Sequence, residues 1–408
     1  MENPKIRFKG FTKDWEQRKL GDVIDDMYNG QTPSRNKSEY WNGTIKWLSS
    51  GELNRGTVYD SIETITEEGQ KAANLKIVPK GTFVMAITGL EAAGTRGNCA
   101  LLGFDTTLNQ SCMALFPKQE MLTSEFLFQW YRKVGEEYGI NYTQGTKQQS
   151  YNAELIKILP ISLPSVVEQR EISSYLSHLD HLITLHQRKC EQTKKLKKYM
   201  LQKMFPQNGA KVPEIRFDGF TYDWEQRKLG DVFEQTSNLV NPKEDEIELW
   251  SLTVEDGLTK KSDRYNREFL VKKDDNFKEV RPGDIVYNPM NMTLGAVGYN
   301  GMAKSVAVSG YYTTMVAKEN YDTYYINTWL KSPQAIRLYR TYATGSLIEK
   351  QRVQFPTLSI IPVTFPKYEE QIKIGSYFHS IDNLITLHQR KCDELKKMKK
   401  YMLQNMFI

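Results

Sequence analysis

The chain has 408 residues, with 55 lysines and arginines against 49 acidic residues and a formal net charge of +6. This length predicts two or three domains, and a composition of 39% hydrophobic and 25% charged residues is that of a folded protein rather than a disordered one. No run of about 18 apolar residues is present to span a bilayer, and the N-terminal MENPKIRFKG lacks the apolar segment of a signal peptide. We therefore expect a cytoplasmic protein that makes no membrane contact.

Two stretches of the chain each occur twice. IRFKGFTKDWEQRKLGDV from Ile6 and IRFDGFTYDWEQRKLGDV from Ile215 agree at 16 of 18 positions and open the two halves. LITLHQRKCEQTKKLKKYMLQKMF from Leu182 and LITLHQRKCDELKKMKKYMLQNMF from Leu384 agree at 19 of 24 positions and close them. The chain is therefore two tandem copies of one unit, which predicts a pseudo-two-fold arrangement.

The first copy is expected to begin with a mixed, loop-rich domain. Residues 28–56 are dense in Gly, Pro, Ser and Asn, with basic and aromatic side chains between them, and we expect Trp41 and Trp47 in the core. Short strands separated by glycine turns follow, then a helix and another loop. The expected strands are residues 44–49, 81–88, 112–116 and 158–164, the helix is 124–134, and the loop is 145–152.

A long helix is expected to end this copy. Ser165 and Glu168 form the S-x-x-E pattern of a capping box at its start, and Pro206 ends it after about 38 residues, or ~57 Å. Spacings that alternate between four and three define a heptad seam, which predicts a coiled coil. The seam consists of Ile172, Leu176, Leu179, Ile183, His186, Cys190, Thr193, Lys197, Met200 and Met204.

The second copy repeats this plan after a polar linker. GSLIEKQR (345–352) occupies the place of GTKQQSYN (145–152), and the seam recurs 202 positions later. The second helix has Lys367 in place of the capping serine, and Gly375 falls within its first turns. Because the sequence holds no third helix of this kind, each seam is expected to pack against the other.

The cysteines and histidines give no indication of a metal site. The cysteines form no CxxC pair and are expected to be buried free thiols: Cys99, Cys112, Cys190 and Cys392. Two of the five histidines, His178 and His181, are replaced by Ser380 and Asn383 in the other copy. Tetrahedral zinc sites need three or four ligands, so no metal is expected.

Positive charge is concentrated near the end of each long helix. Residues 186–205 contain seven Lys or Arg against one Glu, and residues 388–407 contain six against two acidic residues. Such a run is commonly a solvated helix face. The alternative is a surface for nucleic acid or for an acidic partner.

Several motifs carry a resemblance to a known family. GQTPSRNKSEYWNGTIKWLS, together with LPSVVEQREISSYLSHLDHLI and its second version FPKYEEQIKIGSYFHSIDNLI, resembles the specificity subunit of Type I restriction-modification systems. The resemblance covers nearly the whole chain, although the second copy has QTSNLVNPKEDEIELW in place of the first motif. It implies an α+β fold in which two target-recognition domains each read half of a split DNA sequence. Two long antiparallel helices, paired in a coiled coil, would set the spacing between the half-sites.

The resemblance also implies the domain boundaries and the partners. The target-recognition domains are residues 1–164 and 215–366, the spacer helices are 165–206 and 367–408, and the linker is 207–214. Double-stranded DNA is the implied ligand, and two methylation subunits and the restriction subunits are the implied protein partners. S-adenosylmethionine, ATP and Mg are expected on those subunits, and no cofactor is expected on this chain.

Candidate binding residues follow from the loops and the helix ends. The candidate DNA contacts, most of them to phosphate rather than to bases, are Arg35, Lys37, Arg96, Lys147, Gln148 and Gln149 in the first copy and Lys260, Lys261, Arg264, Asn291, Lys350 and Arg352 in the second. The candidate contacts to other subunits, which could instead pack within the chain, are Tyr199, Met200, Met204, Phe205, Tyr401, Met402, Met406 and Phe407.

Two other classes of function remain as alternatives. A DNA methyltransferase or nuclease would need catalytic motifs, yet the sequence has no Walker glycine-lysine loop, no G-x-G-x-x-G and no histidine outside the helices. NPMN at Asn288 resembles an adenine-methyltransferase motif, but Asn291 stands where an aromatic residue should stack on the base. A structural coiled-coil adaptor would explain the helices and would leave two loop-rich domains without a role.

Overall fold

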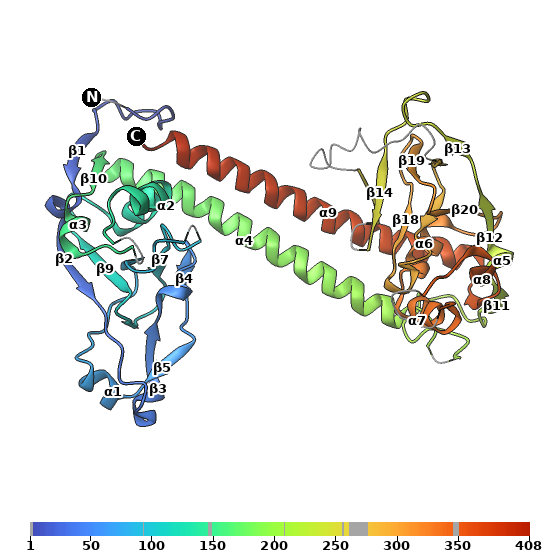
Figure 1. The fold of residues 1–408 in the computed structure, drawn as a ribbon, viewed down its shortest axis with the longest axis horizontal. Coiled ribbons are helices and arrows are strands. Elements are labelled where there is room, and N and C mark those ends of the chain that lie inside the picture. Colours follow the sequence, from blue (N-terminus) through green and yellow to red (C-terminus); the bar gives the residue numbers. More distant parts are fainter. Residues whose placement is uncertain are drawn as a thin grey trace. The chain divides into compact units, whose positions relative to one another are not determined.

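A computed structural model describes residues 3–92, 94–145, 149–207, 209–254, 257–260, 276–345 and 351–408. The chain forms two compact units, the first made of Met1–His186 with Lys391–Ile408 and the second of Gln187–Arg390 (Figure 1). Each unit therefore combines a domain from one half of the chain with the end of the long helix from the other half. Over the described part of the chain, no helix is long and apolar enough to cross a membrane.

The first unit is built on a five-stranded sheet in the order β2-β9-β6-β7-β4, with a three-stranded sheet β5-β3-β8 and the antiparallel pair β1-β10. The four strands and the helix expected here are confirmed, and the helix continues to Asn141. The strands are β1 (Glu16–Lys19), β2 (Ile24–Asn29), β3 (Trp41–Leu48), β4 (Thr57–Val58), β5 (Glu63–Ile65), β6 (Phe83–Ala86), β7 (Cys99–Leu102), β8 (Thr107–Leu108), β9 (Cys112–Pro117) and β10 (Pro160–Leu163), and the helices are α1 (Glu67–Ala72), α2 (Ser124–Asn141) and α3 (Ala153–Lys157).

The second unit repeats this frame with smaller sheets, in the orders β12-β20-β17-β18, β13-β16-β19, β14-β15 and β11-β21. Its strands are β11 (Glu225–Lys228), β12 (Phe233–Thr236), β13 (Leu239–Val240), β14 (Trp250–Thr253), β15 (Gly257–Lys260), β16 (Phe277–Val280), β17 (Ile285–Tyr287), β18 (Val297–Tyr299), β19 (Val306–Ser309), β20 (Thr313–Ala317) and β21 (Pro362–Phe365), and its shorter helices are α5 (Leu229–Val232), α6 (Thr323–Leu330), α7 (Pro333–Tyr342) and α8 (Phe355–Ser359).

The two long helices are α4 (Val166–Lys203) and α9 (Tyr368–Asn405), each of 38 residues. The expected capping box of α4 forms only in part. The Ser165 hydroxyl accepts a hydrogen bond from the Glu168 amide at 3.4 Å, but the Glu168 carboxylate accepts from the Arg7 guanidinium at 2.7 and 2.8 Å instead of from the cap. The long-range ion pair competes successfully because a bidentate, charge-assisted contact is stronger than a neutral one.

The heptad seam is confirmed by burial within each unit. In the first unit the seam residues of α4 from Ile172 to Ile183 are buried, together with Cys392 and Leu395 of α9. The two helices contact each other there through Asp180 with Lys399 and Tyr175 with Met398. In the second unit Lys197 contacts Asp382 and Cys190 contacts the Ile385 carbonyl, so residue numbers fall along α4 as they rise along α9 and the helices run antiparallel. All four cysteines are free and buried.

The duplicated segment that opens each half packs on the duplicated helices. In the first unit the Ile6 amide donates to the Asn405 carbonyl at 2.9 Å, and the Phe8 ring meets Tyr175 edge to face at 5.9 Å. In the second unit Ile215 donates to the Lys203 carbonyl at 2.9 Å, and Phe217 meets Tyr377 at 5.9 Å. The two stretches that agree most closely between the copies are therefore those that contact each other.

Each helix end completes the core of a unit. Met204 and Phe205, at the end of α4, are buried among Trp224, Tyr325 and Phe378 of the second unit. Phe407, at the end of α9, is buried in the core of the first unit against Trp15 and Phe126. The domains are thus anchored to the coiled coil by aromatic packing.

Gly375 within α9 has a steric explanation. A Cβ at this position would overlap Oδ1 of Asp322, which caps α6 by accepting a hydrogen bond from the Tyr325 amide at 2.7 Å. The matching position of α4 is Ser173, which is buried and donates back to the Gln169 carbonyl at 2.7 Å. The glycine therefore allows α6 to approach α9 closely.

Candidate nucleic-acid interface

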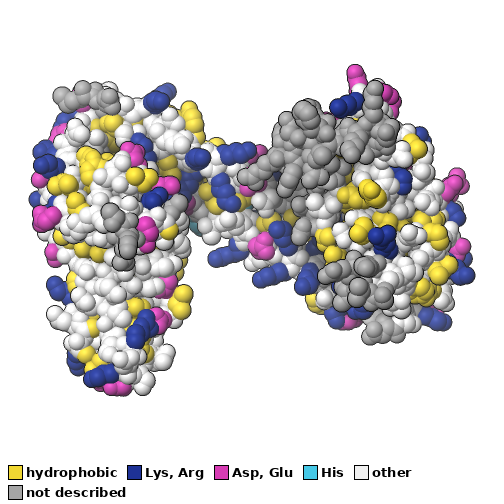
Figure 2. Space-filling view, in the orientation of Figure 1, with side chains coloured by type: hydrophobic (Ala, Val, Ile, Leu, Met, Phe, Trp, Pro, Cys, Tyr) yellow, Lys and Arg dark blue, Asp and Glu magenta, His cyan; other side chains and the backbone are white. Residues whose placement is uncertain are grey.

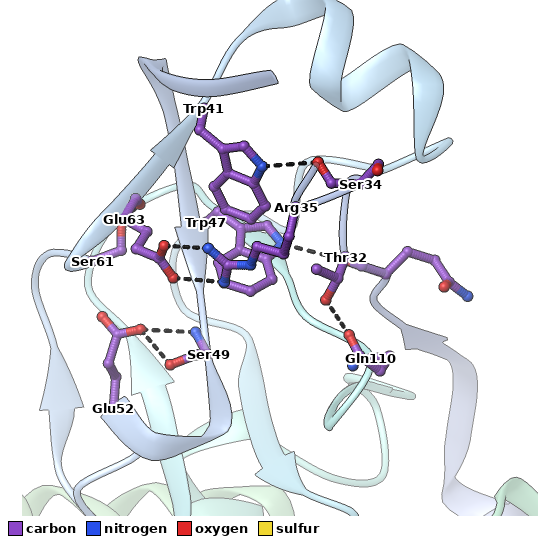
Figure 3. Close-up of polar contacts among 11 residues, drawn as sticks. Thr32, Ser34, Arg35, Trp41, Trp47, Ser49, Glu52, Ser61, Glu63 and Gln110 are labelled. Carbon is purple, nitrogen blue, oxygen red and sulfur yellow. Dashed lines mark hydrogen bonds and ion pairs between the residues drawn. The ribbon is translucent and has the colours of Figure 1, made fainter. Parts of the chain in front are cut away.

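The loop of residues 30–37 in the first unit is held by two tryptophans (Figure 3). The Trp41 indole N–H donates to the Ser34 carbonyl at 3.2 Å, and the Trp47 indole donates to the Gln31 carbonyl at 3.0 Å. Trp47 is buried, as expected for a core residue, while Trp41 is half-buried. Gly30 begins the loop because a Cβ there would overlap the Leu108 carbonyl oxygen.

Arg35, a candidate DNA contact, is engaged within this loop. Its guanidinium carbon lies 3.7 Å from the centre of the Trp41 ring, and the group forms a two-pronged ion pair with Glu63 (Figure 3). The guanidinium holds the pKa of the Glu63 carboxyl below its usual value. Arg35 therefore positions the loop, and any contact with DNA would have to compete with Glu63. Lys37 is exposed, and its ammonium donates to the Tyr40 hydroxyl at 3.0 Å.

Arg96 and Gln149 come together beside the turn that follows β6. The Arg96 guanidinium donates to the carbonyls of Leu90 and Glu91 at 2.8 and 2.7 Å. The Gln149 carbonyl accepts from the Leu90 amide at 3.1 Å, and its own amide donates to the Glu91 carboxylate at 3.2 Å. The loop of residues 145–152 is closed by two backbone hydrogen bonds between Gln144 and Ser150, each of 3.0 Å.

The second unit reproduces this pair of loops on an equivalent backbone. The Val353 amide donates to the Pro289 carbonyl at 2.9 Å, just as Tyr151 donates to Ile87 at 2.9 Å. Thr344 and Arg352 close the second loop as Gln144 and Ser150 close the first. Asn291 and Arg352 are exposed on these two neighbouring segments. The backbone pairs Gln144–Ser150 and Thr344–Arg352 thus flank the two segments in equivalent ways.

Of the remaining candidate DNA contacts, Lys260 forms an ion pair within the chain, and the others lie outside the described residues. Lys260 lies on β15, and its ammonium is 3.3 Å from the Glu248 carboxylate, which also pairs with Lys304 at 3.0 Å. Hydrogen bonds from Lys304, Trp250 and Lys260 lower the pKa of Glu248 to about 2. Five candidates lie outside the described residues: Lys147, Gln148, Lys261, Arg264 and Lys350.

Sequence reasoning missed two turn tips at equivalent places in the two sheets. Gln110 precedes β9 and is exposed beside Thr32, whose hydroxyl contacts its side-chain amide (Figure 3). Tyr311 precedes β20, and 86% of its surface is exposed. The signal that could have revealed them is the alignment of the turns, since both precede the strand that pairs with the first strand of the main sheet.

The helix-end residues divide into buried and exposed groups. Met204, Phe205, Met406 and Phe407 are buried in the cores described above, which is the packing within the chain that the sequence left open as the alternative. Tyr199 and Tyr401 remain 49% and 56% exposed, and Met200 and Met402 are half-buried. Figure 2 shows lysine and arginine side chains along the exposed surface of the long helices.

The interface contains no candidate metal centre among the residues described, since no three His, Cys, Asp or Glu side chains are grouped to hold an ion. Each unit has a frame of strands and helices with two neighbouring loops that carry polar and basic side chains. Such loops can donate hydrogen bonds to phosphates and to base edges.

Comparison with known proteins gives consistent matches. A family model described as the Type I restriction modification DNA specificity domain matches residues 12–195 and again residues 222–397. The MjaIX specificity subunit of Methanocaldococcus jannaschii, a Type I restriction enzyme subunit, is 29% identical over 245 residues, which are 57% of this chain and 54% of that protein. The chain thus matches about half the length of that relative.

Two further proteins match over almost the full length. The MjaVIII specificity subunit of the same organism is 23% identical over 407 residues, or 96% of this chain and 91% of that one. The crystal structure of a Type-I restriction-modification S subunit from M. genitalium superimposes with a TM-score of 0.66 at 14% identity and covers 100% of this chain and 99% of that one. The latter shows a shared fold.

Proposed function

Because the chain belongs to the family of Type I restriction modification DNA specificity domains, we propose that it is the DNA-recognition subunit of a Type I restriction-modification complex. Each domain reads one half of a split duplex sequence, and the paired helices set the distance between the halves. The chain itself is not catalytic. S-adenosylmethionine, ATP and Mg are bound by the methylation and restriction subunits that it directs to DNA.

The observation that carries this proposal is the duplicated loop pair. The hydrogen bonds Tyr151 to Ile87 and Val353 to Pro289 hold equivalent loops in equivalent places. The side chains there differ between the units: Gln149 in one, which is half-buried, and Arg352 in the other, which is exposed. A conserved frame with unlike loops fits two readers of different sequences, because rigid scaffolds carry recognition on their loops. A structural coiled-coil adaptor would have no use for loop side chains that differ between the two units.

Exchange of one domain is expected to change one half of the recognised sequence. Replacing residues 30–160 by the matching segment of a relative alters the loops of the first unit and leaves the second intact. Methylome sequencing of a host that carries the variant and its methylation subunit should show one half-motif replaced and the other retained.

The reciprocal exchange of residues 232–360 is the matched control and should replace the other half-motif. A change of both halves in either variant would contradict independent reading. Methyl transfer by the purified chain alone would instead favour the methyltransferase alternative.

The proposed methylation subunits have two equivalent surfaces on which to dock. Leu196 and Tyr199 are 47% and 49% exposed on α4, and their counterparts Met398 and Tyr401 are 44% and 56% exposed on α9. Each pair lies three residues apart, on one face of its helix. Adjoining apolar side chains exposed on a helix can be buried by a partner, and their duplication fits two copies of one partner.

Polar substitution of one pair is expected to remove one methylation subunit and to leave the other. Leu196→Ser with Tyr199→Ser loses two buried side chains from the interface, about 3–6 kcal/mol, which weakens that contact at least about 100-fold. Mass photometry of the purified complex would then show one methylation subunit per chain. Gln192→Ser, an exposed change on the same helix, is the control. Retention of two subunits by the double variant would argue against this surface.

A further inference from the structure

The turn between β8 and β9 carries Gln110 at the surface of the first unit, where this residue is exposed. The Asn29 side-chain amide donates to the carbonyls of Gln110 and Cys112 at 2.9 and 2.8 Å. The Ser111 amide donates to the Asn109 side chain at 3.1 Å, and the Cys112 amide donates to the Asn109 carbonyl at 3.1 Å. The backbone that carries Gln110 is therefore held by hydrogen bonds on both sides.

This turn adjoins two of the loops described above. On one side the Gln31 amide donates to the Leu108 carbonyl at 3.0 Å, which joins the turn to the loop held by the tryptophans. On the other side the Ile87 amide donates to the Ser111 carbonyl at 2.9 Å, and the Ile87 carbonyl accepts from the Tyr151 amide at 2.9 Å. The turn therefore lies between segments that the proposed function assigns to DNA.

The Thr32 hydroxyl fixes the direction of the Gln110 side chain (Figure 3). It donates a hydrogen bond to Oε1 of Gln110. A carbonyl oxygen has two lone pairs, so Oε1 can accept one more hydrogen bond. The Nε2 group has two N–H donors, and no partner for them is present among the residues that the structure describes. The exposed amide thus has a donor and an acceptor available side by side.

The groups around this amide favour a base edge over a phosphate. The side chains that contact the turn and its ends are neutral, namely Asn29 and Thr32. Arg35, in the same loop as Thr32, is paired with Glu63 at 2.9 Å. A phosphate only accepts hydrogen bonds and would leave the acceptor of the amide unused, whereas a base edge can present an acceptor and a donor together.

We propose that Gln110 reads an adenine in the major groove, an inference that rests on the proposed function. Adenine presents the N7 acceptor and the N6 amino donor on its major-groove edge. Nε2 of Gln110 donates to N7, and the second lone pair of Oε1 accepts from the N6 amino group. Thr32 is a positioning residue, because its hydrogen bond favours one of the two flipped orientations of the amide. Gln110 therefore determines one base of the half-site that the first unit reads.

The second unit presents a different side chain from the equivalent turn. Gln110 and Tyr311 each stand two residues before the strand, β9 or β20, that pairs with the first strand of the main sheet. Tyr311 is 86% exposed. Its single hydroxyl cannot form the paired contact of an amide with adenine. The two units thus carry unlike groups at one backbone position, as readers of unlike half-sites require.

The test changes the hydrogen-bonding groups of this one side chain. Gln110→Glu keeps the shape and replaces the N–H donors by a second acceptor, which matches the N4 amino group of cytosine. Gln110→Ala removes both groups. Gln119→Glu is the matched control, because Gln119 is exposed and follows the other end of β9. The full chain with its methylation subunit selects duplexes from a library in which each position of the methylated motif is varied, and the bound sequences are counted.

Gln110→Glu is expected to exchange adenine for cytosine as the preferred base at one position of the first unit's half-motif, which the domain exchange identifies. Gln110→Ala should reduce the preference for adenine at that position by about 5- to 150-fold, the discrimination that one paired contact provides. The other positions and the half-motif of the second unit should stay unchanged. Gln119→Glu should select the original motif.

Thr32→Val tests the orientation of the amide. This variant lacks the hydroxyl, so the amide of Gln110 can turn over, and the preference for adenine should weaken while the preferred base stays the same. Thr32→Ser should restore the preference, because serine supplies the same hydroxyl. A purely structural role of Thr32 would instead lower the affinity for all sequences alike.

Several outcomes would overturn the inference. A first half-motif without an A·T pair, or a loss of preference at a G·C position in Gln110→Ala, would exclude an adenine reader. Equal weakening on all sequences would identify a phosphate contact instead. If the unchanged complex selects no split motif, the proposed function itself fails. If the unchanged complex selects a split motif and Gln110→Ala selects it with the same preferences, only the inference about Gln110 fails.

Discussion

Replacing Met406 and Phe407 by alanine is expected to unfold the first half of the protein, although both residues follow the helix of the second half. Phe407 is buried with its ring 5.3 Å from Phe126 and 6.3 Å from Trp15. Removing a buried phenylalanine side chain costs about 3–5 kcal/mol and a buried methionine about 2–5 kcal/mol. The sum is comparable with the whole stability of a typical domain, about 5–15 kcal/mol.

Hydrogen exchange read by mass spectrometry would locate this effect. Amides of β6, β9 and α2 should lose protection in the Met406→Ala/Phe407→Ala variant, while those of β17, β20 and α6 keep theirs. The matched variant Met204→Ala/Phe205→Ala should give the opposite pattern, because its side chains fill the core of the second unit. If the Met406→Ala/Phe407→Ala variant instead lost amide protection in the second unit, the helix ends would not anchor the domains as described.

Arg216→Met is expected to lower the free energy of unfolding of the second unit by about 3–5 kcal/mol. The Arg216 guanidinium donates to both oxygens of Glu370 at 2.7 and 2.8 Å, and the Glu370 side chain is fully buried. The hydrogen bond to Glu370 raises the pKa of Arg216, against the opposing effect of burial. Methionine keeps much of the apolar packing of the arginine stem but leaves the carboxylate buried without a partner.

A double-mutant cycle in urea would measure this pair. The variant Arg216→Met/Glu370→Met should recover most of the lost stability, because it removes the uncompensated charge. Arg7→Met in the first unit is the matched change, since Arg7 contacts Glu168 with the same two distances. A double variant as unstable as Arg216→Met alone would mean that packing, rather than the unpaired charge, causes the loss.

The shared framework of the two units was predictable because its segments occur twice in the sequence. The helix expected at 165–206 is observed as Val166–Lys203, and the seam residues Ile172, Leu176, Leu179, Ile183, Cys190 and Met204 are buried in the expected heptad order. Duplication could also have revealed the contact between the opening segment and the helix, since Arg7 and Glu168 recur as Arg216 and Glu370. The heptad spacing of apolar residues and the internal repeat both indicate which residues pack together, because both appear as regular spacings along the chain.

Two features were not predictable from local sequence patterns. One is that each long helix ends in the core built by the other half of the chain, and the other is that candidate DNA contacts such as Arg35 and Lys260 form ion pairs within the chain. An apolar cluster such as Met406 and Phe407 satisfies a partner subunit or an internal core equally well, and only the tertiary arrangement decides between them. Arg35 was assigned to DNA because it lies in a polar loop, yet Glu63, 28 residues away, pairs with it. Lys260 is paired in the same way with Glu248. An ion pair between distant segments that does not recur in the second copy leaves no signature at either residue.

The exchange of helix ends has a consequence for synthesis on the ribosome. Residues 391–408 belong to the first unit, so its core remains incomplete while about 200 further residues are translated after His186. At roughly 5–20 residues per second this interval lasts about 10–40 s. During that time the apolar seam of α4 and the pocket beside Trp15 lack the residues that cover them. The domain made first is therefore completed last.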